Sequence, residues 1–297
     1  MMFKRCLLSL VLAGASWSAL ADAAHADVEF AIIKTGKTTA LKGMMVSGGG
    51  FTTKVDGNFS AILVKHGQAT FLFDSGLGSK VAEQYQQDMP WWARAFFKYE
   101  NPVVPARVQL DKAGIPPIER IFLSHAHWDH ASGLGDFPEA VVWAAPEELK
   151  VIEHAAPGLG GSWPSQVSLK SIRWQSLEFK PQPHKVFDRS IDVFADGSVV
   201  LVPMFGHTPG SIGMFVTVAS GKRFFFCGDA VWRADALKDG SPKFWPASLI
   251  VDKDREQTQH TIEQMRELVK LDPGLVVVPA HDDTVQSALG YFPSWIK

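Results

Sequence analysis

Short apolar runs bounded by Gly, Pro, Asp or Asn recur along the chain, and they predict β-strands. Runs of Val, Ile, Leu and Phe with little polar interruption are typical of strands that are buried on both faces. Such runs occur at residues 29–33, 61–64, 70–73, 120–123, 141–144, 199–204, 214–218, 223–227 and 275–279.

Helical periodicity separates several of these runs. Residues 79–88 and 146–154 show it, and the second segment begins with Pro followed by two acids, as first turns of helices often do. The clearest helix is predicted over 254–271, where residues such as Ile262 and Leu268 follow helical spacing. Strands mixed with helices, without a linker or an obvious repeat, indicate one domain of the α/β or α+β class.

Residues 1–26 differ from the rest of the chain. They combine the basic start M-M-F-K-R, an apolar middle and two small-residue sites. This layout is typical of a secretory signal peptide that is cleaved after Ala21 or Ala26, with a retained N-terminal anchor as the alternative. We therefore expect a periplasmic or secreted protein with one domain over residues 27–297 and no membrane attachment after cleavage.

Charge and cysteine content narrow the classes of partner. The net charge is −2, and the basic residues are scattered, so no broad positive field favours nucleic acid. Signal cleavage would leave Cys227 as the only cysteine, which excludes an intramolecular disulfide. We expect no nucleic-acid partner, and we interpret Cys227 as a small buried residue at a strand end.

Side chains that can bind metals follow five of the predicted strands. The motifs after these strands are D-S-G (74–76), S-H-A-H-W-D-H (124–130), G-H-T-P-G (206–210), G-D-A (228–230) and A-H-D (280–282). Strand ends are common places for functional groups in α/β folds, and imidazoles and carboxylates suit zinc and similar ions. The candidate metal ligands are His125, His127, Asp129, His130, His207, Asp229 and His281.

Spacing within the second motif predicts how its side chains point. His125 and His127 are two positions apart, so in extended backbone both point to the same side. Asp129 and His130 are adjacent, so we expect them to point apart and to serve a neighbouring position. Asp229 could bridge two ions, which in two-metal sites lie about 3.5–4 Å apart.

The motif H-A-H-W-D-H resembles the H-x-H-x-D-H signature of the metallo-β-lactamase-fold hydrolases. The later G-H-T-P-G, G-D-A and A-H-D motifs follow in that family's order, so the resemblance covers about residues 60–282. It implies an α/β fold, an αββα four-layer sandwich with metals at one edge. It assigns His125, His127 and His207 to one ion. It assigns Asp129, His130 and His281 to a second ion, with Asp229 bridging the two.

The same resemblance implies a cofactor and a reaction. The cofactor would be two divalent metal ions, with Zn favoured and Mn, Fe or Co as alternatives because all accept such ligands. A bridging hydroxide would be the nucleophile, since metal binding lowers the pKa of water to roughly 7. Asp129 could orient it or carry its proton to the leaving group. Asp74 is expected to orient a histidine, with an ordinary turn aspartate as the alternative.

At two positions this sequence differs from other branches of the family, and these differences reduce the number of expected substrate classes. Class B β-lactamases place Cys or Ser near the position of Asp229, and flavodiiron proteins carry Glu at that of His127. The chain most resembles N-acyl-homoserine lactonases and organophosphate hydrolases, which implies a hydrolase of lactones, carboxylic esters or phosphotriesters. With the signal peptide expected at residues 1–26, this hydrolase would be exported. A persulfide dioxygenase with one iron is the alternative, and a β-lactamase is a weaker one.

Aromatic residues are candidates for the substrate pocket. Trp91 and Trp92 belong to W-W-A-R-A-F-F (91–97), which could form a helix at the pocket mouth, pack in the core or contact a second copy in a homodimer. Trp232 is a further candidate for the pocket that receives the small-molecule substrate. It stands where the lactonases often carry a Tyr, a departure that counts against homoserine lactones.

Overall fold

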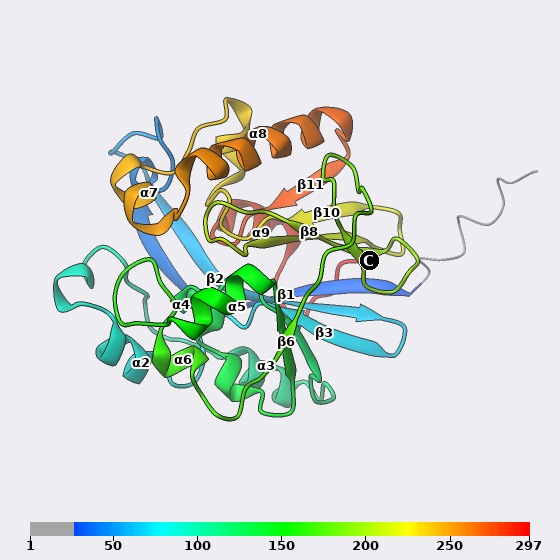
Figure 1. Cartoon of the computed structure of the whole chain (residues 1–297), viewed down its shortest axis with the longest axis horizontal. Helices are drawn as coiled ribbons and strands as arrows, with labels where there is room; N and C mark the ends of the chain where they lie inside the picture. Colours follow the sequence, from blue (N-terminus) through cyan, green and yellow to red (C-terminus); the bar gives the residue numbers. More distant parts are fainter. Residues whose placement is uncertain (1–26) are drawn as a thin grey trace, which may run out of the picture.

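The computed structural model describes residues 27–297 and contains two β-sheets that lie face to face (Figure 1). The predicted signal peptide, residues 1–26, lies outside the described residues. Within 27–297, no helix combines the length and the apolar character that crossing a bilayer requires.

The first sheet has six strands and the second has five. In spatial order the first contains β1 (Val28–Leu41), β2 (Lys54–His66), β3 (Ala69–Phe73), β4 (Arg120–Phe122), β5 (Val141–Ala144) and β6 (Arg173–Ser176). The second contains β11 (Leu275–Val278), β10 (Arg223–Phe226), β9 (Ile212–Thr217), β8 (Val199–Pro203) and β7 (Ile191–Asp192). Strands β3 to β6 run parallel, as do β10 and β11, and the remaining pairs are antiparallel.

An apolar core fills the space between the sheets. The ring of Phe30 on β1 packs edge to face against Phe224 and Phe226 on β10, with centroid separations of 4.8 and 5.1 Å. Edge-to-face contacts of this kind add to the gain from burying the rings. These contacts pack the two sheets against each other.

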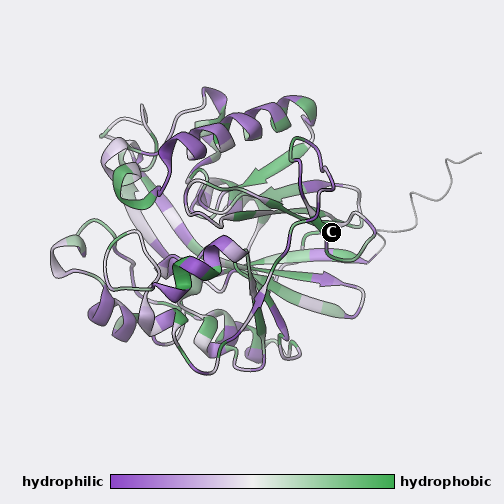
Figure 2. Cartoon of the chain, in the orientation of Figure 1, coloured by the Kyte–Doolittle hydropathy of each residue, from purple (hydrophilic) through white to green (hydrophobic). Residues whose placement is uncertain are grey.

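Helices cover the outer faces of both sheets. Side chains of α3 (Ala106–Lys112), α5 (Pro146–Glu153) and α6 (Pro164–Val167) pack on the first sheet, and α8 (Arg255–Leu271) packs on the second. Figure 2 shows α8 with a hydrophilic outer surface, while the strands beneath are hydrophobic. The predicted αββα four-layer sandwich is therefore confirmed.

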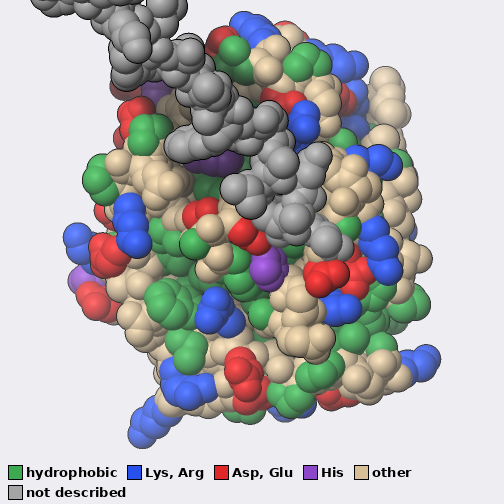
Figure 3. Space-filling view, turned by 90° about the vertical axis from the view of Figure 1, so that its right-hand side faces the viewer, with side chains coloured by type: hydrophobic (Ala, Val, Ile, Leu, Met, Phe, Trp, Pro, Cys, Tyr) green, Lys and Arg blue, Asp and Glu red, His purple; other side chains and the backbone are tan. Residues whose placement is uncertain are grey.

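Short helices complete the structure. They are α1 (Lys42–Met45), α2 (Val81–Asp88), α4 (Trp128–Ala131), α7 (Trp245–Val251), α9 (Asp283–Leu289) and the 3-10 turns η1 (Trp91–Ala93), η2 (Leu134–Asp136) and η3 (Ala234–Lys238). Acidic, basic and apolar side chains are interspersed over the face that Figure 3 presents.

Most predicted elements are present, with three kinds of difference. The helices predicted at 79–88, 146–154 and 254–271 correspond to α2, α5 and α8. Strands β1 and β2 are longer than predicted. The C-terminal half of β1 and the N-terminal half of β2 are more polar than the predicted runs, and they extend beyond the core to line a cavity. The sequence did not predict the short strands β6 and β7 or the short helices α1, α3, α4, α6, α7 and α9, and 91–97 forms only the η1 turn instead of a helix.

Candidate metal centre

The motifs after the five strands meet at one edge of the sandwich. Asp74 follows β3, residues 124–130 follow β4, His207 follows β8, Asp229 follows β10 and His281 follows β11. Within each sheet these strands run in the same direction, so their carboxyl ends lie at the same edge. The sheet topology thus brings together residues that are far apart in the sequence.

The seven candidate ligands form three overlapping groups of buried side chains. In each group, one ligand atom per residue lies within 4.8 Å of the others. The groups are His125, His127 and His207; His125, His130 and Asp229; and Asp129, His130 and His281. The first and third groups correspond to the two sets that the resemblance assigns to separate ions, and Asp229 lies between them.

Asp229 presents its two oxygens to different histidines. Its Oδ1 lies 3.2 Å from Nε2 of His130, and its Oδ2 lies 3.1 Å from Nε2 of His281 and 3.5 Å from Nε2 of His207. Nε2 of His207 in turn lies 3.2 Å from Nε2 of His125. A carboxylate in this position can share its oxygens between two ions.

Several buried atoms of the cluster have no hydrogen-bond partner among the described residues. They include Nε2 of His127, Nε2 of His130 and Oδ1 of Asp229. Nε2 of His130 and Oδ1 of Asp229 lie 3.2 Å apart but not in hydrogen-bond geometry, so all three atoms lack a hydrogen bond, although buried polar atoms are nearly always paired. Imidazole nitrogens and carboxylate oxygens that converge in this way are the donor set that zinc-like ions bind. The residues present therefore fit divalent metal ions.

Outer partners hold the other ring nitrogen of four of the histidines. Nδ1 of His130 lies 2.8 Å from Asp74 Oδ2, and Nδ1 of His207 lies 2.8 Å from Asp252 Oδ1. The carbonyl oxygen of Asn58 lies 2.7 Å from Nδ1 of His281, and Oγ of Ser124 lies 3.0 Å from Nδ1 of His125. Such partners direct Nε2 toward the cluster and fix the ring, as they do around metal-binding histidines.

Asp74 adopts a backbone conformation that is uncommon outside glycine. Its φ is +62°, and its carboxylate accepts hydrogen bonds from the backbone and hydroxyl of Ser124 as well as contacting His130. A positive φ at a non-glycine residue persists when its surroundings fix it, and such residues often occur at functional sites. The structure places Asp74 where the sequence predicted a partner that orients a histidine.

The expectation that Asp129 and His130 point apart is wrong. Both lie in the single helical turn α4, where neighbouring side chains differ by about 100° instead of the 180° of a strand. Asp129 Oδ2 lies 3.8 Å from Nε2 of His130 and 3.3 Å from Nε2 of His281. The extended backbone predicted for the motif extends through His127, whose ψ is 156°, and ends there.

A buried carboxylate that the sequence did not single out connects two ligand-bearing loops. Glu148, on α5, accepts hydrogen bonds from the backbone of Ala126 at 2.7 Å, the hydroxyl of Thr208 at 2.6 Å and the backbone of Gly210 at 3.2 Å. A Cβ on Gly210 would come within 2.2 Å of the Glu148 backbone nitrogen, so only glycine permits this approach. Glu148 thereby ties the loop with His125 and His127 to the loop with His207.

The sequence also did not identify Asp252 and Lys243 as residues of the site. Both are buried behind His207, and Lys243 donates a hydrogen bond to Asp252 at 2.6 Å. Their surrounding sequence carries no metal-binding motif, so only the tertiary structure identifies them.

Burial and nearby charges shift the pKa values of the cluster in opposite directions. Burial lowers the pKa of His125, His127 and His207, which keeps these rings neutral and able to bind a cation. Burial also acts to lower the pKa of His130, but the carboxylates of Asp74 and Asp229 outweigh it and raise the pKa well above its usual value. Three of the histidines are therefore in the form that binds a cation, whereas His130 must first lose its proton.

Cys227 lies beside the cluster but does not fit the role of nucleophile. It directly follows β10, its thiol is buried, and burial raises its pKa to about 12. A thiol acts as a nucleophile in its ionised form, which such a pKa disfavours.

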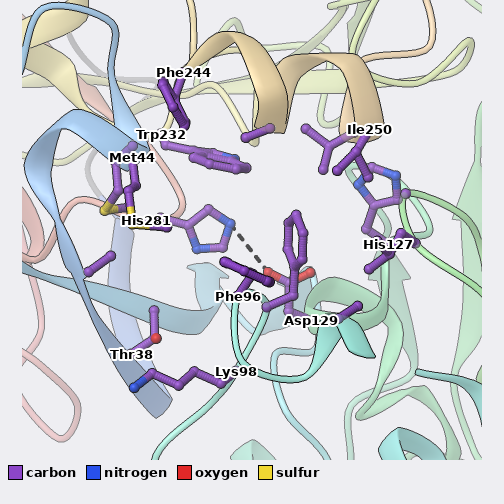
Figure 4. Close-up of a pocket in the computed structure, with 18 of the residues that line it drawn as sticks. Thr38, Met44, Phe96, Lys98, His127, Asp129, Trp232, Phe244, Ile250 and His281 are labelled. Carbon is purple, nitrogen blue, oxygen red and sulfur yellow. Dashed lines mark ion pairs between the residues drawn. The ribbon is translucent and has the colours of Figure 1, made fainter. Parts of the chain in front are cut away.

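A cavity of about 880 Å³ lies over the cluster, and His127, Asp129, His207, Asp229 and His281 line it. Figure 4 shows the labelled side chains of the cluster facing this space together with apolar neighbours. The apolar residues of the wall include Met44, Met45, Phe96, Phe97, Trp232, Phe244 and Ile250. A largely apolar cavity with a few polar groups at one end is the usual form of a small-molecule site.

The three predicted pocket tryptophans lie in different places. Trp92 and Trp232 line the cavity, and Nε1 of Trp232 donates a hydrogen bond to Asp229 at 2.9 Å. Trp91 is not among the residues that line the cavity, and it is 81% exposed. The expectation that Trp91 lines the pocket is therefore wrong.

The amino-acid sequence of this chain is similar to those of several known proteins. A probable metallo-hydrolase of Mycobacterium tuberculosis is 31% identical over 182 residues, which cover 56% of this chain and 55% of the relative. An acyl-coenzyme A thioesterase of Bos taurus is 28% identical over 232 residues, which cover 75% of this chain and 72% of the relative. This chain thus spans about half the length of the mycobacterial relative.

A solved structure shares the fold. It is an N-acyl homoserine lactone hydrolase with the product N-hexanoyl-L-homoserine bound at its catalytic metal centre. It matches with a TM-score of 0.67 at 18% identity, over 90% of this chain and 98% of that chain. The sequence model of the metallo-β-lactamase superfamily matches residues 56–281, a range that holds all seven candidate ligands. The chain belongs to the metallo-β-lactamase superfamily.

Proposed function

We propose that this chain is an exported hydrolase that uses two divalent metal ions to cleave acyl compounds, with lactones and carboxylic esters as the first substrate classes to test. The observation that carries the proposal is the position of the seven-residue cluster at one end of a large apolar cavity. The lactone hydrolase with the same fold and the thioesterase relative both act on acyl compounds, which supports this choice of substrate.

Two separate groups of candidate ligands support the binding of two ions instead of one. His125, His127 and His207 would hold one, and Asp129, His130 and His281 would hold the other, with Asp229 shared. When bound, such ions supply Lewis acidity, which activates water and polarises a carbonyl oxygen. The one-iron dioxygenase alternative would need only part of this set.

The chain's own residues supply binding and proton transfer. The apolar wall, including Phe96 and Ile250, would bind the acyl part of the substrate and exclude water from it. Asp129 lines the cavity, so its carboxylate can hold a proton from water and release it to the leaving group. The N–H of Trp232 already bonds to Asp229, so Trp232 serves that carboxylate rather than a substrate carbonyl.

The test is a substrate panel on the mature chain with measured metal content. The panel holds lactones of several acyl lengths, p-nitrophenyl esters, acyl thioesters, a phosphotriester and nitrocefin. We expect the lactones or esters to turn over fastest and chelation to abolish the activity. Fastest turnover of nitrocefin, or oxygen uptake with a persulfide in the presence of one iron, would contradict the proposal.

Export is tested separately. Expression in a bacterial host followed by mass spectrometry of the periplasmic fraction should give a chain that begins after Ala21 or Ala26. A cytoplasmic chain that retains residues 1–26 would contradict export and would leave the proposed chemistry untouched.

A further inference from the structure

Lys243 is a buried charge that the proposed reaction does not use. Its side chain is 1% exposed, and its ammonium donates to Asp252 Oδ1 at 2.6 Å and to the carbonyl of Ala230 at 3.3 Å. The ammonium also lies 5.8 Å from the ring centroid of Trp232. Burying an ammonium is costly, and even a well-paired buried charge adds little to stability. The position of Lys243 is therefore better explained by a function than by stability alone.

One set of contacts leads from Lys243 to His207. The Asp252 oxygen that accepts from Lys243 also lies 2.8 Å from Nδ1 of His207, and its other oxygen accepts from Ser248 at 2.6 Å. Asp252 is therefore fixed on both oxygens, and it fixes the imidazole in turn. The ring of His207 can then present only Nε2 to the cluster.

A second set of contacts leads from Lys243 to Asp229. The ammonium lies over the indole of Trp232, a favourable cation–π arrangement. The same indole donates its N–H to Asp229 Oδ2 at 2.9 Å. Lys243 thus stands behind two candidate ligands from different loops, and Nε2 of His207 lies 3.5 Å from Oδ2 of Asp229.

Lys243 and Asp252 also stand at the two ends of α7. This helix spans Trp245–Val251, and four of its residues, Pro246, Ala247, Ile250 and Val251, line the cavity. The ion pair therefore joins both ends of one wall of the cavity and connects that wall to the cluster.

We propose that Lys243 is a positioning residue that fixes the orientation of His207 and Asp229 for metal binding and holds α7 against the centre. The inference rests on the proposed function, in that metal ions bind to this cluster. A purely structural ion pair would stabilise α7 without affecting how the ions bind.

The test replaces Lys243 with Met, which has a similar length and no charge. Zinc and cobalt affinities are measured by chelator competition, and the visible absorption spectrum of the cobalt form reports ligand geometry. We expect Lys243→Met to weaken at least one of the two ions by about tenfold or more and to change the cobalt spectrum. Lys243→Arg keeps the positive charge and should recover part of both losses.

Arg223→Met is the matched control. Arg223 also pairs with a buried aspartate, Asp272, through contacts of 2.7 and 2.9 Å, but it stands at the start of β10, at the far end of that strand from Asp229. We expect this variant to lower the melting temperature and to leave both metal affinities and the cobalt spectrum as in the wild type.

Lys243→Met with wild-type affinities and spectrum would overturn the inference, whatever its melting temperature. If Lys243→Met does not fold, the double variant Lys243→Met with Asp252→Asn removes both charges together and is compared with Asp252→Asn alone. We expect the double variant to bind metal more weakly than Asp252→Asn, because it also loses the contact of Lys243 with Trp232, and equal affinities of the two variants would overturn the inference. A wild-type chain that binds no metal would overturn the proposed function as well. A wild type that binds two ions beside an unaffected variant would overturn this inference alone.

Discussion

Asp74 Oδ2 lies 2.8 Å from Nδ1 of His130, and the two residues follow the parallel neighbouring strands β3 and β4. The contact joins an aspartate with a positive φ to a histidine whose Nε2 has no hydrogen-bond partner among the described residues. The pairing of β3 with β4 therefore determines where His130 points.

Asp74→Ala should weaken metal binding without removing a ligand. Loss of the carboxylate frees the ring of His130 to rotate and lowers its basicity, and changes of this kind cost roughly 10–100-fold in metal affinity. Chelator competition with zinc measures the effect. Asp56→Ala is a control, because Asp56 is a partly exposed acid on β2. Equal zinc affinities for Asp74→Ala and the wild type would refute the role of Asp74.

Metal binding should release protons and weaken as the pH falls. The carboxylates of Asp74 and Asp229 outweigh burial and raise the pKa of His130, so its imidazole carries a proton below that pKa. The proton must leave before Nε2 can bind a cation. Affinity should therefore fall by about tenfold per pH unit for each displaced proton below the raised pKa, and should level off above it.

Calorimetric titration of zinc in buffers with different ionisation enthalpies counts the released protons. Asp74→Asn should reduce the number near neutral pH, because it removes one of the charges that raise the pKa of His130. An affinity that stays constant between about pH 6 and pH 8 would argue against the protonated state of His130.

Glu148→Ala should destabilise the fold and disorder the centre together. The substitution leaves the backbone donors of Ala126 and Gly210 and the hydroxyl of Thr208 buried without their acceptor. The expected loss in the free energy of unfolding is on the order of 3 kcal/mol, measured by urea denaturation of the metal-free chain. Glu153→Ala, at an exposed position of the same helix, should change it by less than about 0.5 kcal/mol. Similar losses in the free energy of unfolding for the two variants would refute the role of Glu148 in joining the two ligand-bearing loops.

Trp92→Ala and Trp91→Ala should separate the cavity wall from the outer surface. Trp92 lines the cavity, whereas Trp91 is 81% exposed beside it. If the acyl chain lies against this wall, Trp92→Ala should raise KM by about tenfold for long-chain substrates and much less for short ones. Trp91→Ala should leave both unchanged. Equal effects of the two variants on KM would place the acyl chain elsewhere.

The candidate ligands could be predicted from the sequence because their signal is local. Each follows a strand that is readable as an apolar run, and four of them share one heptapeptide. The directions of Asp129 and His130 were missed because one turn of helix, α4, replaces extended backbone after His127. No periodic pattern can be recognised in four residues.

Glu148, Lys243 and Asp252 could not be predicted for a different reason. In the sequence they are ordinary charged residues of helices and loops, which are exposed in most proteins. They are buried here because α5 and the segment around α7 pack against the ligand loops, contacts that span many tens of residues. Helices α3, α7 and α9, of seven residues each, were missed because such short helices depend on tertiary packing.

Native mass spectrometry of the purified chain, loaded with zinc and then dialysed, tests the central claim most directly by counting the retained ions. We predict two zinc ions per wild-type chain and fewer in both His127→Ala and Asp229→Ala, since each removes a side chain from the cluster. A wild-type chain that retains one ion or none, or variants that retain two, would contradict the account of a two-metal centre.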